Sequence, residues 1–162
     1  MLSKLKWERD LAVNLGSTNT LEAIFALVNA FTTAWHLAEW TSYAVDPTSI
    51  ATGGLGEYRA DVVRRCPELR FCDQVANTVK HRQRLRGNDP GIIARSMVRS
   101  VLRRREDYAG PPVHLALVFD PRIRDAAGEH SAIAVIDTVI DFWAGELERL
   151  QLTRRVNHPP NG

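Results

Sequence analysis

Residues 21–45 read LEAIFALVNAFTTAWHLAEWTSYAV, a run in which almost every position is apolar or small. Within this run, polar residues recur at the three-to-four spacing that puts side chains on one face of a helix. These residues are Asn29, Thr32, Thr33, His36 and Glu39. Buried polar groups cost free energy unless they meet hydrogen-bonding partners. The run therefore predicts a long core helix whose polar face contacts neighbouring elements.

A second polar row lies in residues 72–81, CDQVANTVKH. Its polar members follow the i, i+4, i+7 and i+8 pattern that places them on one helical face. We expect this face to meet the polar face of residues 21–45 inside a bundle and to form a site there. The expected catalytic residues are His36, Glu39, Asn77, Lys80 and His81. The residues expected to bind substrate are Asp73, Arg82, Arg84 and Trp40.

Length and composition indicate one soluble globular domain. The chain has 162 residues, of which 44% are hydrophobic and 25% charged, which is ordinary for a folded domain. The formal net charge is only +2, but arginines gather in the middle of the chain. They are Arg82, Arg84, Arg86, Arg95, Arg99, Arg103, Arg104 and Arg105. Such a basic stretch either attracts phosphate or is simply a solvated face.

The cysteine count and the chain start indicate a cytoplasmic protein. Cys66 and Cys72 are the two cysteines, too few for a four-thiolate zinc site, and we expect both to be reduced and partly buried. The segment MLSKLKWERDL carries charges where a signal peptide needs an apolar run. Residues 21–45 have the length of a membrane span, but the polar residues near their centre are costly in hydrocarbon. We therefore expect a core helix and no membrane partner.

Capping signals set the bounds of the first helices. Residues 3–14 predict a short helix stopped by Gly16, with Lys4 and Glu8 as an i, i+4 pair. Asn19 is placed to cap the next helix, with Glu22 completing a variant of the capping box. That helix is expected to end near Val45, because the residue before a proline disfavours helical geometry.

The middle of the chain predicts a loop and two shorter helices. PTSIATGGLG, residues 47–56, reads as a loop because of its glycines. A short helix is expected over 56–65. Another is expected from Pro67, which is tolerated in a first helical turn, to about Leu85.

Residues 92–119 change in character from helical to extended. MVRSVLRRR and VHLALVF are rich in β-branched residues and leucine and are separated by AGPP, a pattern that predicts an antiparallel hairpin. A basic helix over 92–105 is the alternative. Residues 121–130, PRIRDAAGEH, are expected to form a loop. Ser131 then caps an amphipathic last helix with a long apolar stripe.

These elements together predict the fold class. We expect a mainly α protein, a helical bundle with a small antiparallel β-hairpin inserted before the last helix. Residues 1–152 are expected to form the single domain and residues 153–162 a disordered tail. The aromatic residues near His36 and in the last helix either line a pocket for a flat ligand or lie in the core, and we favour the core for Trp35, Trp40, Tyr43 and Trp143.

Two kinds of chemistry are open to the polar rows. His36 and Glu39, joined by Asp73 or His81, offer the imidazole and carboxylate ligands that zinc or iron accepts. Asp73 and His81 lie about two helical turns apart, however, so one ion does not easily reach both. We therefore expect no metal and no cofactor, and keep a metal-dependent enzyme as an alternative. The second kind of chemistry is acid–base catalysis on a phosphodiester, because Lys80 beside His81 brings positive charge next to a proton-transferring group.

Residues 124–130 read RDAAGEH, an arginine and a histidine separated by five residues. This motif and the all-helical layout resemble the HEPN group, the higher eukaryotes and prokaryotes nucleotide-binding domains. Many members are ribonucleases of toxin and phage-defence systems that act as dimers through such a motif. The resemblance implies that Arg124 contacts phosphate and that His130 acts in metal-free cleavage driven by the 2′-hydroxyl. Gly128 departs from the family pattern, because it puts the motif in a loop before a helix.

The leading hypothesis is a HEPN-like domain that binds or cleaves RNA or nucleotides, as in toxin–antitoxin or defence ribonucleases. Its expected partners are RNA or a nucleotide, a small antitoxin-like protein, and a second copy of the chain. The rival hypothesis is a noncatalytic protein-interaction module whose polar rows form a buried structural network. The sequence does not decide between these two hypotheses.

Overall fold

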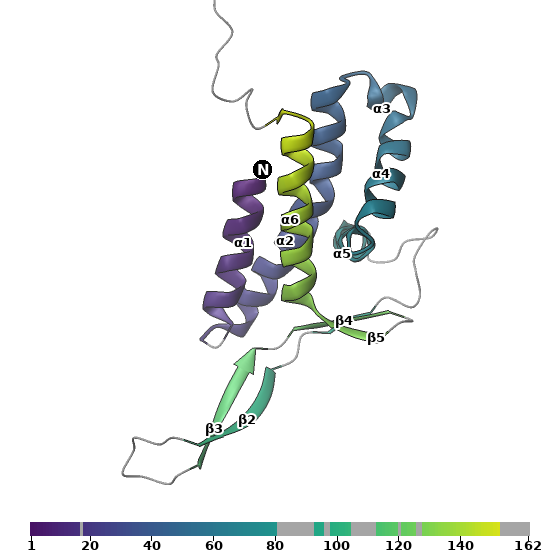
Figure 1. Cartoon of the computed structure of the whole chain (residues 1–162). Helices are drawn as coiled ribbons and strands as arrows, with labels where there is room; N and C mark the ends of the chain where they lie inside the picture. The colour runs from purple at the N-terminus through teal and green to yellow at the C-terminus, as the bar shows by residue number, and fades with distance from the viewer. Residues whose placement is uncertain are drawn as a thin grey trace, which may run out of the picture.

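The computed structural model describes residues 1–16, 18–80, 93–95, 98–104, 113–119, 121–125 and 128–152. Side chains are described for these residues except 78–80, 93–95, 98–104 and 113–119. The helices are α1 (Leu2–Leu15), α2 (Thr20–Val45), α3 (Ser49–Thr52), α4 (Gly54–Arg65), α5 (Leu69–Lys80) and α6 (Ala132–Arg149). The strands are β1 (Ile93–Arg95), β2 (Val98–Arg104), β3 (Val113–Phe119), β4 (Arg122–Asp125) and β5 (Gly128–Ser131). The predicted fold class, a helical bundle with an inserted hairpin, is confirmed (Figure 1).

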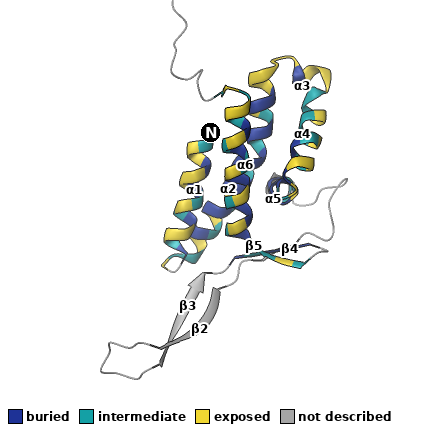
Figure 2. Ribbon diagram, in the orientation of Figure 1, coloured by how far each residue is buried: buried dark blue, intermediate teal, exposed yellow. Residues whose placement is uncertain are grey.

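Helix α2 is the centre of the bundle and packs against α1, α4, α5 and α6. It begins as predicted, because the Asn19 side chain accepts a hydrogen bond from the backbone N–H of Glu22 at 3.3 Å. It ends at Val45, before Asp46 and Pro47. By length and composition α2 is also able to cross a membrane, although half of its most apolar window is buried inside the bundle. Figure 2 shows this inner face of α2 as a buried band.

Helix α6 packs on α2 through a tryptophan and a row of alanines. Trp143 is fully buried, and its indole N–H donates to the carbonyl of Ala34 at 3.0 Å. Ala30, Ala34 and Ala38 are each fully buried on α2. Their small side chains let the indole approach the α2 backbone closely, so the expectation that Trp143 lies in the core is confirmed.

Two other aromatic residues of α2 do not join this core. Trp40 is 59% exposed and Tyr43 is 54% exposed, whereas Trp35 is only 9% exposed. The expectation of burial was therefore wrong for Trp40 and Tyr43. They lie near the C-terminal end of α2, where Trp40 lines a cavity together with Leu37 and Leu147.

The inserted hairpin is confirmed, and strands replace one predicted loop. Strands β2 and β3 pair antiparallel from Val98 opposite Phe119 to Arg104 opposite Val113. Residues 121–130 were predicted to be a loop, which is wrong, because β4 and β5 form there and join β1 in a three-stranded sheet. The polar Asp125 occupies a buried position of β4. Because the inward-facing Asp125 is polar, the sequence of β4 lacks the alternation of apolar and polar residues that indicates a strand.

The loop prediction for residues 47–56 was also wrong in part. This stretch holds the short helix α3 and the beginning of α4. Asp46 accepts hydrogen bonds from the backbone N–H of Thr48 at 2.9 Å and from its hydroxyl at 2.7 Å, which organises the turn before α3. Gly53 has φ +83°, a left-handed conformation that glycine adopts readily, and it separates α3 from α4.

The two cysteines lie in the core around the start of α5. Cys66 and Cys72 are both free, as predicted, and both are buried more completely than the expected partial burial. Burial, together with the nearby charge of Glu68, raises the pKa of the Cys66 thiol to about 11. Burial raises the pKa of the Cys72 thiol well above its usual value. Both thiols therefore stay protonated near neutral pH, a state in which they are poor nucleophiles.

A buried carboxylate ties α4 to α6. The Glu146 side chain is 1% exposed and accepts two hydrogen bonds from Arg65, both at 2.8 Å. It also accepts two from Arg149, both at 2.9 Å, and one from the Tyr58 hydroxyl at 3.0 Å. Burial alone would raise the pKa of this carboxyl, but the hydrogen bonds from Arg149, Arg65 and Tyr58 outweigh it and hold the pKa well below its usual value.

Candidate functional site

The polar face of α2 finds its partners on α1 and α4. The Lys4 ammonium on α1 donates to the buried Thr33 hydroxyl at 2.8 Å and to Glu8 at 2.7 Å. The Lys4–Glu8 pair confirms the predicted i, i+4 contact. Glu39 pairs with Arg59 of α4 at 3.4 Å. The Thr32 hydroxyl donates to the carbonyl of Val28, one turn back, at 2.9 Å.

The second polar row is described only at its beginning. Asn77 bonds within α5, because its amide nitrogen donates to the backbone carbonyl of Asp73 at 2.7 Å and also to its carboxylate. Helix α5 ends at Lys80, whose side chain is outside the described residues, as are His81, Arg82 and Arg84. Half-buried His36 lies on α2. The meeting of His36 with His81 therefore stays a prediction.

A third polar group, of which the sequence analysis named only His130 as a site residue, surrounds the buried carboxylate of Asp125. The Asp125 side chain is 3% exposed, and His130 Nε2 lies 3.1 Å from its Oδ1. The backbone N–H of Gly128 donates to the same oxygen at 3.0 Å. Arg70, from the beginning of α5, pairs with the other oxygen, Oδ2. Two elements far apart in sequence, α5 and the β4–β5 hairpin, therefore meet at one carboxylate.

The register of β4 and β5 explains why Asp125 and His130 point inward. Ile123 pairs with His130, and Asp125 pairs with Gly128. Ile123 is buried at 1% exposure, and paired residues and residues two apart share a face of a sheet. Asp125 and His130 therefore lie on the face that holds Ile123, the face turned toward the helices. Gly128, with φ +146°, adopts at the beginning of β5 a conformation that other residues rarely reach.

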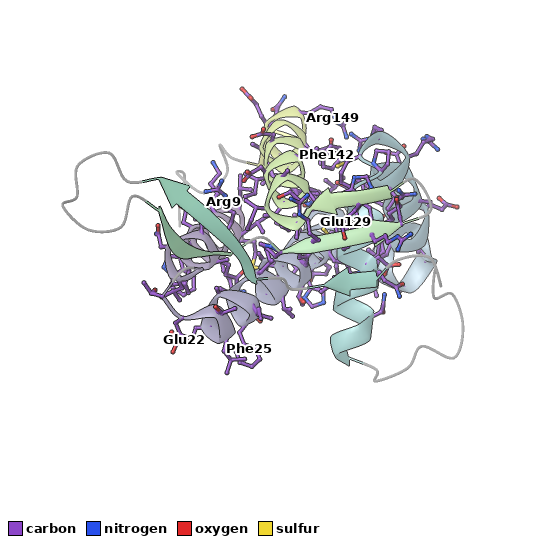
Figure 3. The ribbon with its side chains drawn as sticks, turned by 90° about the horizontal axis from the view of Figure 1, so that it is seen from below. Arg9, Glu22, Phe25, Glu129, Phe142 and Arg149 are labelled. Carbon is purple, nitrogen blue, oxygen red and sulfur yellow. The ribbon has the colours of Figure 1, made fainter. Side chains whose placement is uncertain are left out.

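The same register separates the two ends of the RDAAGEH motif. Arg124 pairs with Glu129, and both are exposed on the opposite face of the sheet from His130. Figure 3, seen from below, shows the sheet in front of the helices with Glu129 on it. Within one chain the structure does not bring Arg124 and His130 together. Among the residues whose side chains are described, the arginine that shares the Asp125 carboxylate with His130 is Arg70.

A cavity of about 250 Å³ opens next to this group, between α5, β5 and α6. Arg70, Phe71 and His130 line it, and the Phe71 and His130 ring centres are 5.4 Å apart. The first turns of α5 and α6 also line the cavity. Helix N-termini carry partial positive charge from unpaired backbone N–H groups. With Arg70, they make one side of the cavity suitable for an anion, while Glu68 at its edge contributes one negative charge.

The contact between His130 and Asp125 determines which ring nitrogen of His130 carries the proton and which one is able to act as a base. An ionised carboxylate only accepts hydrogen bonds, so a neutral His130 places its proton on Nε2, facing Asp125. The basic lone pair is then on Nδ1. The His130 side chain is 38% exposed, whereas its carboxylate partner is buried. A half-exposed imidazole oriented by a buried carboxylate is the arrangement that general bases use.

Metal ligation finds no support in the described part of the chain. Among the residues whose positions are given, no three histidine, cysteine, aspartate or glutamate side chains come close enough to hold an ion. Glu39, one of the four candidate ligands from the sequence, is already paired with Arg59. His81, another of the four, lies outside the described residues, so the complete set stays a prediction.

The sequence named His130 but missed Arg70 as a site residue and mentioned Asp125 only as part of a motif. No local pattern links residue 70 to residue 125, because their contact depends on how α5 packs over the β4–β5 hairpin. A weak signal did exist for Asp125, since aspartate followed three residues later by glycine is typical of a turn held by a side chain.

No family model, curated protein or solved structure matches this chain. The likeness to HEPN domains therefore stays a prediction from a short motif. The geometry around His130 is the basis on which a function can be assigned.

Proposed function

We propose that this chain binds RNA and cleaves it in the cavity lined by His130 and Arg70. The observation that carries the proposal is the environment of His130. Its ring contacts the buried Asp125 carboxylate through Nε2, and the residue also lines the cavity. A proton-transferring group, an orienting carboxylate and an arginine are thus assembled in one place, which is what phosphodiester cleavage needs.

His130 acts as the general base in the proposed reaction. Its Nδ1 takes the proton from the 2′-hydroxyl of a ribose, and the 2′-oxygen attacks the adjacent phosphorus. The bond from phosphorus to the 5′-oxygen of the next nucleotide breaks, and that oxygen takes a proton from water. The products are a 2′,3′-cyclic phosphate and a 5′-hydroxyl end. Asp125 holds the ring in the required tautomer and stabilises the imidazolium that forms.

Arg70 supplies the positive charge that this reaction needs at phosphate. Its side chain is 45% exposed, and its guanidinium is held by the Asp125 carboxylate through Nη2. A guanidinium has five N–H donors in a rigid plane, so a group anchored through one nitrogen still presents donors to phosphate oxygens. The Arg70 side chain also lies over the Phe71 ring, 5.0 Å from its centre, which further restricts its position.

Other features of the chain are consistent with an RNA ligand. The arginine-rich segment between Arg82 and Arg105 brings positive charge next in sequence to α5, and phosphate contacts supply most of the sequence-independent affinity for nucleic acid. A homodimer, and a small antitoxin-like protein partner, belong to the same proposal because the HEPN resemblance implies them.

The proposal predicts cleavage of RNA but not of DNA. Purified protein incubated at low salt with a labelled single-stranded RNA is expected to bind it and to release fragments with 2′,3′-cyclic phosphate ends. The matched control is the same oligonucleotide with one 2′-deoxy position, which is expected to resist cleavage at that position because the nucleophile is missing. Gel analysis of the ends checks both. No binding at low salt, where phosphate affinity is greatest, or equal cleavage of the deoxy control, would contradict the proposal.

A noncatalytic interaction module is the second candidate, and one observation favours it. Three members of the α2 polar row already have partners inside the fold: Thr33 with Lys4, Thr32 with Val28, and Glu39 with Arg59. Polar groups that are satisfied in this way act as a structural network and need no ligand. If the RNA assay fails while the protein is folded, this second function becomes the better account.

A further inference from the structure

One face of α2 turns away from the bundle and carries large apolar side chains at both ends. Leu21 and Phe25 lie near the beginning of α2, and Tyr43, with Trp40 at the edge of the face, lies near its end. All four residues are more than half exposed. Figure 3 shows Phe25 at the outer edge of the molecule, on the opposite side from Phe142 of α6. Large exposed apolar residues gathered on one face indicate a surface that another molecule covers.

The middle of the same face is polar. Asn29 and Thr32 follow Leu21 and Phe25 at the three-to-four spacing of one helical face. Asn29 is exposed, whereas Thr32 is half-buried. The Thr32 hydroxyl donates its proton to the carbonyl of Val28 at 2.9 Å, so its oxygen is left as an acceptor. The centre of the face therefore offers an amide donor beside a hydroxyl acceptor.

The apolar residues of this face are placed symmetrically about Thr32. Leu21 lies eleven residues before Thr32 and Tyr43 lies eleven residues after it, which is about 17 Å along the helix in each direction. Phe25 and Trp40 lie seven and eight residues from Thr32. If two copies of α2 cross antiparallel at Thr32, at the small angle of helix bundles, Phe25 of each copy meets Trp40 of the other. The face is thus complementary to itself, as a two-fold dimer requires.

We propose that this outer face of α2 binds a second copy of the chain, with the two α2 helices antiparallel. The apolar residues of the two copies then pack together at both ends of the contact. Near the two-fold axis, the Asn29 amide of each copy donates to the Thr32 hydroxyl of the other, so the polar centre is satisfied when water is excluded. The proposed function includes a homodimer without a surface for it, and this face supplies the surface.

The size of the face fits a dimer of modest affinity. From Leu21 to Tyr43 the face is about 33 Å long, and a helix with its side chains is about 11 Å wide. The strip of roughly 350 Å² per copy is smaller than the about 800 Å² that a stable interface buries on each side. Trp7 of α1, which is 61% exposed and lines one groove with Phe25, extends the strip. We therefore expect a dissociation constant on the order of 10 μM or weaker.

Nucleic acid and lipid fit this face less well than a second copy does. Helix α2 contains no lysine or arginine, and its two charged residues are Glu22 and Glu39, so the phosphates of RNA or of anionic lipid are disfavoured. Lipid hydrocarbon would leave the Asn29 amide at the centre of the face without a partner. A second copy provides an apolar partner for each end and a polar partner for the centre.

The first test is sedimentation equilibrium of the full chain between about 1 μM and about 500 μM. Across this range we expect the wild type to change from the mass of one chain to the mass of two. Phe25→Glu, which puts a carboxylate into the apolar contact, is expected to weaken self-association about tenfold or more. Tyr43→Glu tests the other end of the face and serves if circular dichroism shows that Phe25→Glu does not fold. The matched control is Val13→Glu on α1, 44% exposed and outside this face, with unchanged self-association.

Cysteine cross-linking tests the antiparallel orientation. Thr32→Cys places the two thiols next to the two-fold axis, within reach of a disulfide, whereas Phe25→Cys places them about 21 Å apart along the helices. With oxidised glutathione, Thr32→Cys is expected to give a covalent dimer on a non-reducing gel, and Phe25→Cys is not. The native thiols of Cys66 and Cys72 are buried and protonated, so they should not react.

Three results would overturn this dimer: a wild type that stays monomeric at about 500 μM, glutamate variants that self-associate like the wild type, or equal cross-linking of Phe25→Cys and Thr32→Cys. The outcome is separate from that of the RNA assay, because the residues of this face do not line the cavity beside His130. A wild type that dimerises through α2 but cleaves no RNA would contradict the proposed function alone.

Discussion

Replacing His130 by alanine is expected to lower the rate of RNA cleavage by about 10²- to 10⁴-fold, the usual contribution of a general base. The physical reason is that no other described group in the cavity combines a basic nitrogen with a buried orienting carboxylate. RNA binding should weaken little, because Arg70 and the helix N-termini stay in place. Initial rates under single-turnover conditions, together with a gel-shift affinity, measure both quantities.

The control for this experiment is His36→Ala. His36 is the histidine that the polar row of α2 predicts as catalytic, and it is half-buried on a different helix. If the site is the cavity beside His130, His36→Ala retains most of the cleavage rate, whereas His130→Ala loses it while melting near the wild-type temperature. A large loss of cleavage rate with His36→Ala and a small loss with His130→Ala would contradict the site beside His130. It would instead support the site that the sequence predicts between the two polar rows.

Replacing Glu146 by alanine is expected to lower the free energy of unfolding by about 3 kcal/mol. The change leaves Arg65 and Tyr58 with unpaired polar groups between α4 and α6, and removing one member of a buried ion pair typically costs about 3–5 kcal/mol. We expect the lower end of this range because Arg149, at 59% exposure, is able to turn into solvent. Urea unfolding followed by circular dichroism measures the change.

Asp61→Asn is the matched control for Glu146. Asp61 also pairs with Arg65, at 2.9 Å, but it is 37% exposed, so its loss should cost less than about 1 kcal/mol. A second readout is pH. Because the folded-state pKa of Glu146 is lowered, its contribution is present above the usual value of 4.5 and is lost as the pH falls below it. Wild type should therefore lose more stability than Glu146→Gln between about pH 6 and about pH 3. Equal losses would contradict the account of this cluster.

The parts of the fold that the sequence predicted are those controlled by local signals. The length of residues 21–45, the Asn19 cap and the proline after Asp46 together set the bounds of α2, and the structure agrees. The Ser131 cap of α6 is likewise observed, with its hydroxyl oxygen accepting from the backbone N–H of Ala134 at 3.4 Å. The β2–β3 hairpin followed from two extended runs separated by a breaker. Each of these signals acts over a few residues and does not depend on contacts with distant parts of the chain.

The parts that the sequence missed depend on contacts between distant residues. Strands β4 and β5 were not predicted, because their inward positions hold polar residues whose partner, Arg70, comes from α5. The partners of the α2 polar row were sought on α5, but for Thr33 and Glu39 they come from α1 and α4. The spacing of polar residues predicts which of them share one face of a helix. Which other helix packs against that face depends on the packing of the whole bundle.

We propose that Arg70, and not Arg124, is the arginine that acts together with His130. The most direct test compares Arg70→Ala with Arg124→Ala in one RNA-cleavage assay, with wild type alongside. We expect a large loss of cleavage rate for Arg70→Ala and a far smaller change for Arg124→Ala, because Arg124 is exposed on the opposite face of the sheet from His130. A loss with Arg124→Ala that equals or exceeds the loss with Arg70→Ala would contradict it.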